Sequence, residues 1–149
     1  MPVVWIVEDE KTYREKARAI VAHTAADADM ELHLIEWDGH GPLSDEQQSK
    51  PADLVILDLN LSHGISGLNA LRKIPGFHNR HKDRLHPYVI IWSHFDGELE
   101  VDPMPRARDL KFHFNPDRVF RTYWKAETNL ETALQGFLSR MKEEGVYHG

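Results

Sequence analysis

The chain has 149 residues, of which 41% are hydrophobic and 28% are charged, a composition typical of a folded domain with its own core. The net charge of −6 argues against direct binding to nucleic acid, because phosphate backbones require a basic surface. The absence of cysteine excludes disulfides and thiol chemistry. We find neither a signal-peptide pattern nor an apolar run near the roughly 20 residues of a membrane-spanning helix, so we expect a cytoplasmic protein.

Segments with the patterns of strands and helices alternate along the sequence. Continuous β-branched runs predict strands that are buried on both faces, and apolar residues spaced by about 3.6 positions predict helices. The predicted strands cover residues 3–7, 31–37, 53–57, 88–92 and 118–124, the second of them as an edge strand. The predicted helices cover residues 12–23, 66–74 and 127–142, with a helical turn at 45–48. This alternation predicts an α/β fold with a five-stranded, parallel, doubly wound sheet.

Polar side chains follow four of the predicted strands at the points where the strands end. Glu8 and Asp9 follow the first strand, Asp58 the third, Ser93 the fourth and Lys125 the fifth. These strands are neighbours in a doubly wound sheet, so we expect the side chains to converge at its carboxyl edge. Two like charges 4 Å apart repel by about 4 kcal/mol at an effective dielectric constant near 20, so three carboxylates need compensation. Mg²⁺, a lysine and a hydroxyl would supply it and would form a site for a phosphoryl group.

The pattern resembles the receiver domains of two-component response regulators, including the chemotaxis-type receivers that consist of one domain. The resemblance is carried by the segments VVWIVEDE, LVILDLNL, VIIWS and YWK, which follow one another in this order. It implies a flavodoxin-like sheet with the strand order 2-1-3-4-5. It also implies that Mg²⁺ is held by Asp9, Asp58 and the backbone carbonyl of Asn60, with Glu8 assisting through water.

The same resemblance implies a phosphorelay function. Asp58 would accept the phosphoryl group, and Ser93 and Lys125 would bind its oxygens. The donor would be a sensor histidine kinase or a phosphotransfer protein, and a downstream output protein would read the signal, with no direct contact to nucleic acid and no membrane insertion. We expect residues 1–149 to form a single receiver domain without an output domain, and we do not expect a dedicated enzyme.

Two other functions stay open at this point. The chain could be a pseudo-receiver, an interaction module that works without phosphorylation. This alternative is favoured by Thr122, which stands where the family has an aromatic switch residue, and by the long connection over residues 95–117. The third function is a phosphohydrolase with Asp58-x-Asn60-x-Ser62 as its nucleophile motif. Haloacid dehalogenase-type enzymes carry a related motif on their first strand, whereas here it follows the third predicted strand.

Overall fold

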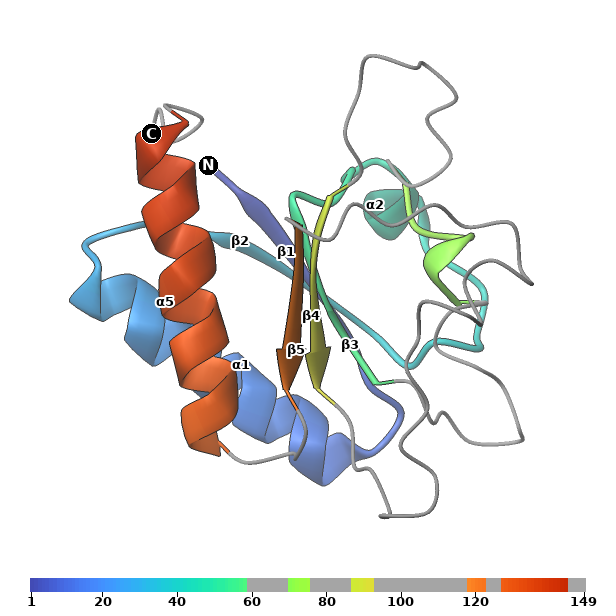
Figure 1. Ribbon diagram of the computed structural model, residues 1–149. Coiled ribbons are helices and arrows are strands. Elements are labelled where there is room, and N and C mark those ends of the chain that lie inside the picture. The colour runs from blue at the N-terminus through green and yellow to red at the C-terminus, as the bar shows by residue number, and fades with distance from the viewer. Residues whose placement is uncertain (59–69, 76–86, 93–117, 123–126, 145–149) are drawn as a thin grey trace.

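The computed structural model describes residues 1–58, 70–75, 87–92, 118–122 and 127–144 (Figure 1). The described elements follow one another as β1 (Val3–Val7), α1 (Lys11–Asp27), β2 (His33–Trp37), α2 (Asp45–Gln48), β3 (Leu54–Leu57), β4 (Tyr88–Trp92), β5 (Val119–Thr122) and α5 (Glu127–Glu143). Residues 66–69 of the predicted helix at 66–74 lie outside the described residues, whereas residues 70 and 71 are helical. Residues 72–74 form a turn and a bend, so the predicted end of this helix at residue 74 is wrong. Within the described parts of the chain, no helix is long and apolar enough to span a membrane.

The five strands form one sheet in the order β2-β1-β3-β4-β5, and every neighbouring pair is parallel. This order confirms the predicted fold class, places β2 at an edge as expected, and makes β3 the central strand. The register pairs Val7 of β1 with Trp37 of β2 and with Leu57 of β3. Because the last residues of three neighbouring strands lie side by side, whatever follows them meets at one edge of the sheet.

Alternate residues of each buried strand face opposite sides of the sheet and form two separate cores. One core lies between the sheet and the helices α1 and α5, which cover the same face (Figure 1). The other core lies on the opposite face of the sheet, against the segment 70–74. The members of the first core include Val4, Ile6, Leu54, Ile56, Ile90, Trp92, Val21, Leu134 and Phe137. Those of the second include Trp5, Val7, Val55, Leu57, Val89, Ile91, Ala70, Leu71 and Ile74.

Helix α1 ends at Asp27, four residues beyond the predicted end at residue 23. The extension continues the buried side of the helix, since Thr24 and Ala25 are both buried against the core. Alanine is also the best helix former, which favours further turns wherever packing allows them. The predicted helix is confirmed, and only its end was placed four residues too early.

A polar cluster ties the end of α5 to the beginning of β4. The hydroxyl of Tyr88 donates a hydrogen bond to Oε1 of Glu144. The guanidinium carbon of Arg118 lies 4.1 Å from the centre of the Tyr88 ring, and Nη2 of Arg118 lies 3.8 Å from Oε2 of Glu144. Burial raises the pKa of Tyr88, and the hydrogen bond to Glu144 raises it further. Tyr88 is therefore held in its neutral form at the amino edge of the sheet.

Tyr88→Phe is expected to lower the free energy of unfolding by about 1 kcal/mol at neutral pH, the usual net contribution of one hydrogen bond. The folded state binds the Tyr88 proton more tightly than the unfolded state does, so this contribution is present below the ordinary pKa of 10.0 and is lost as the pH rises through the raised value. Urea unfolding of both proteins at about pH 8 and above pH 10 checks this. A difference in stability that does not shrink at alkaline pH would contradict it.

Candidate functional site

Three of the predicted site residues meet at the carboxyl edge of the sheet. Their backbones extend the strand pairing: the amide of Glu8 donates to the carbonyl of Trp37 at 3.0 Å, and the amide of Asp58 donates to the carbonyl of Val7 at 3.2 Å. One carboxylate oxygen from each of Glu8, Asp9 and Asp58 lies within 4.8 Å of the other two. Glu8 and Asp58 are only 2% and 4% exposed, and Asp9 is half-buried.

The other predicted site residues are Asn60, Ser93 and Lys125, and all three lie outside the described residues. The same holds for Ser62 of the alternative hydrolase motif. Their roles in binding a metal ion or a phosphoryl group stay predictions. The described residues do bring Glu8, Asp9 and Asp58 together, and we call these three residues the acidic cluster.

The acidic cluster offers only oxygen donors from carboxylates that are close together and largely removed from water. Bringing two unit charges to about 4 Å costs about 4 kcal/mol at an effective dielectric constant near 20, so a nearby positive charge would stabilise the arrangement. Hard divalent cations such as Mg²⁺ and Mn²⁺ prefer carboxylate, carbonyl and water oxygens. The chemistry of this donor set therefore fits a divalent cation of that kind.

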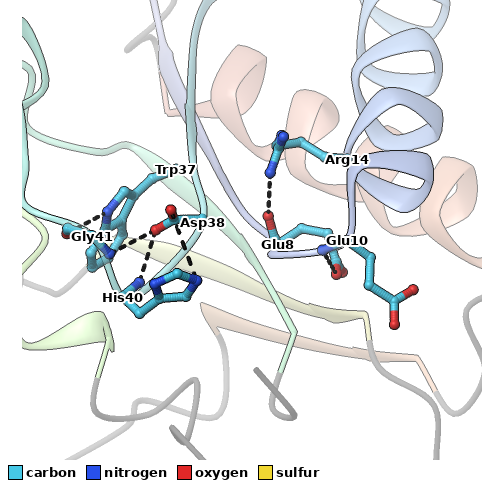
Figure 2. A network of polar contacts seen from close by, with 7 residues as sticks. All are labelled: Glu8, Glu10, Arg14, Trp37, Asp38, His40 and Gly41. Carbon is cyan, nitrogen blue, oxygen red and sulfur yellow. Dashed lines mark hydrogen bonds and ion pairs between the residues drawn. The ribbon is translucent and has the colours of Figure 1, made fainter. Parts of the chain in front are cut away.

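Hydrogen bonds within the turn from β1 to α1 hold Glu8 of the acidic cluster in place (Figure 2). Oε1 of Glu8 accepts the amide proton of Glu10 at 3.1 Å. Helix α1 begins directly after this turn, and its first hydrogen bond runs from the amide of Arg14 to the carbonyl of Glu10 at 2.9 Å. Nη1 of Arg14 also donates to the backbone carbonyl of Glu8 at 3.1 Å. The residue before Asp9 is thus fixed through both its side chain and its carbonyl group.

Sequence reasoning missed Asp38, which follows β2 at the same edge of the sheet. Oδ1 of Asp38 accepts the amide protons of His40 at 3.0 Å and of Gly41 at 2.8 Å, and Nε1 of Trp37 donates to the carbonyl of Gly41 at 3.0 Å (Figure 2). Burial raises the pKa of Asp38, but the two amide hydrogen bonds and the charges of His40 and Arg14 outweigh burial and hold the pKa below its ordinary value. The signal in the sequence is an aspartate after a strand, followed by glycine three positions later.

Asp38→Ala is expected to lower the free energy of unfolding by about 1 kcal/mol at neutral pH, because the loop loses its amide acceptor. A lowered folded-state pKa means that the charge on Asp38 stabilises the fold above the ordinary value of 3.8 and stops doing so as the pH falls through the lowered value. The difference between the two proteins in urea unfolding should therefore narrow in acid. A difference that is the same at pH 7 and in acid would show that the charge contributes nothing.

Comparisons with known proteins support the fold but give no match in sequence. Neither a model of a protein family nor a curated protein matches the chain. Among solved structures, a response regulator receiver domain from Rhodospirillum rubrum is similar, with a TM-score of 0.55 and 19% identity over 95% of this chain and 94% of that chain. The Mn²⁺-bound form of the response regulator Rcp1 has a TM-score of 0.55 and 21% identity over 93% of both chains.

A flavodoxin-like domain from Synechococcus sp. is similar as well, with a TM-score of 0.54 and 11% identity over 96% of this chain and 99% of that chain. The chain therefore has the fold that receiver domains share with flavodoxin-like domains. The resemblance to receiver domains, predicted from the residues at the strand ends, is confirmed at the level of the fold.

Proposed function

We propose that this chain is a phospho-receiver of a two-component signalling system, with Asp58 as the phospho-acceptor. The observation that carries the proposal is the acidic cluster, whose three carboxylates lie within 4.8 Å of one another at the carboxyl ends of β1 and β3. In a parallel α/β sheet this edge is where ligands bind. The receiver fold of the solved structures that match along nearly the whole chain supports the same reading.

Mg²⁺ is the cofactor in this proposal. Asp9, Asp58 and the backbone carbonyl of Asn60 would hold it, and Glu8 would assist through water. The all-oxygen donor set of the acidic cluster supports such an ion, and the similar structure of Rcp1 is a Mn²⁺-bound form. When bound, the ion would neutralise charge on the phosphoryl oxygens.

The transfer itself is nucleophilic chemistry at Asp58. A carboxylate oxygen of Asp58 attacks the phosphorus atom of a phosphohistidine, a new P–O bond forms, and the P–N bond of the donor breaks, so that the imidazole nitrogen leaves with its electron pair. Lys125 pairs with one phosphoryl oxygen, and Ser93 donates a hydrogen bond to another. The product is an acyl phosphate on Asp58.

The donor is a sensor histidine kinase or a phosphotransfer protein, and a downstream output protein reads the phosphorylated state in the cytoplasm. Phosphorylation adds a charge of about −1.5 to −2, which biases an equilibrium between two conformations of the receiver. The protein is not a dedicated enzyme, since the phosphoryl group stays on the chain until it is removed or hydrolysed.

Mass spectrometry of the intact chain after incubation with Mg²⁺ and a small acyl-phosphate donor tests this function. We expect the addition of one phosphoryl group, which peptide mapping assigns to Asp58. If neither a small donor nor a histidine kinase labels the chain, the pseudo-receiver becomes the better assignment. Turnover of a generic phosphate ester would instead indicate a phosphohydrolase.

A further inference from the structure

Arg14 is a cation on α1 that contacts the backbone of Glu8, a member of the acidic cluster, and the proposed function gives it no role. It lies in the first turns of α1 and is half-buried. Side chains on a helix lean toward its N-terminus, and this lean brings the guanidinium of Arg14 back over the end of β1 (Figure 2). There Nη1 donates to the backbone carbonyl of Glu8 at 3.1 Å.

That carbonyl belongs to the peptide unit that joins Glu8 to Asp9. A peptide unit is planar, so a hydrogen bond that holds its oxygen also fixes the orientation of its N–H group and the position of the next Cα atom. The amide of Glu8 is already bound to Trp37 in the sheet, and its Oε1 holds the amide of Glu10. Arg14 therefore supplies a hydrogen bond that fixes the Glu8–Asp9 peptide plane, and this plane places the Cα atom of Asp9, from which its carboxylate projects.

We propose that Arg14 is a positioning residue of the acidic cluster, which holds Asp9 in the orientation needed to bind a divalent cation together with Asp58. This inference rests on the proposed metal site. In this role Arg14 acts through the backbone, because Nη1 donates its hydrogen bond to the carbonyl of Glu8.

The direction in which the cation affinity changes when Arg14 is neutralised separates a positioning role from a purely electrostatic one. A positive charge close to a cation site weakens cation binding by Coulomb repulsion, so a role of charge alone predicts tighter binding when Arg14 is neutralised. Positioning predicts the opposite change. Loss of a group that orients a metal ligand commonly costs about tenfold or more in metal affinity.

The experiment measures the dissociation constants of Mg²⁺ and Mn²⁺ on the full chain by calorimetry, together with the electron paramagnetic resonance spectrum of bound Mn²⁺. We expect Arg14→Met to weaken binding about tenfold and to change the Mn²⁺ spectrum. Arg18→Met is the matched control, because Arg18 carries the same charge on the same helix but pairs with Glu36 at 3.1 Å. It should leave both readouts unchanged.

Arg14→Lys is a second variant in case Arg14→Met does not fold. It keeps the charge but lacks the planar fork of the guanidinium, so we expect weaker binding from it as well. Binding by Arg14→Met that is as tight as that of the wild type, or tighter, would overturn the positioning role while the metal site itself survives. A wild-type chain that binds neither ion would overturn the proposed metal site and this inference with it.

Discussion

Asp58→Asn is expected to abolish phosphoryl labelling of the chain, both by small acyl-phosphate donors and by a histidine kinase. An amide lacks the anionic oxygen that attacks phosphorus, so the loss should be complete. The variant should still fold, because asparagine has nearly the same shape and the substitution removes one of three crowded negative charges. Intact-mass spectrometry after incubation with Mg²⁺ and donor gives the label, and circular dichroism checks the fold.

Asp53→Asn is the matched control for this labelling experiment. Asp53 comes just before β3, at the opposite end of the strand from Asp58, and its Oδ2 accepts the amide proton of Val3 at 2.7 Å. An asparagine there keeps an acceptor oxygen and should keep the full label. A phosphoryl group that persists in Asp58→Asn, mapped to Ser62, Ser66 or a histidine, would show that Asp58 is not the acceptor.

The sheet could be predicted from the sequence because its strands are buried on both faces. Such strands read as unbroken runs of β-branched and aromatic residues, and the predicted bounds of 3–7 and 88–92 agree with β1 and β4. Their alternation with helices predicted a parallel, doubly wound sheet, and the resemblance to receiver domains implied the order of its strands. The start of β2 was harder to predict, because only two of its five residues are buried and its pattern is weaker. The strand starts at His33 instead of the predicted residue 31.

The acidic cluster could be predicted for a related reason. Strand ends line up at one edge of a parallel sheet, so residues that follow strands are brought together by topology alone. This logic reached Glu8, Asp9 and Asp58, and the structure brings all three together. It could not find Arg14, because Arg14 acts from a helix through a backbone carbonyl. Asp38 does follow the end of a strand, but its carboxylate accepts the amide protons of its own loop, and sequence reasoning gave it no role.

The second large effect is expected from metal binding. Mg²⁺ at 100 times its dissociation constant should raise the free energy of unfolding by about 2.7 kcal/mol, because it binds the folded chain and not the unfolded one. Asp9→Asn should abolish this gain. The same variant should be more stable than the wild type in the absence of Mg²⁺, since it relieves repulsion among the three carboxylates. Thermal unfolding of both proteins, with and without Mg²⁺, measures the two effects.

Glu15→Gln is the control for the loss of one negative charge near this edge of the sheet. Glu15 is exposed on α1, where it lies 3.9 Å from Lys11, and its substitution should leave the Mg²⁺ effect intact. Asp9→Asn should therefore be more stable than the wild type without Mg²⁺ and less stable than the wild type at saturating Mg²⁺. We expect this reversal from Asp9→Asn and not from Glu15→Gln. An equal response of the wild type and Asp9→Asn to Mg²⁺ would exclude Asp9 as a ligand, because non-specific screening by a divalent salt acts on both proteins alike.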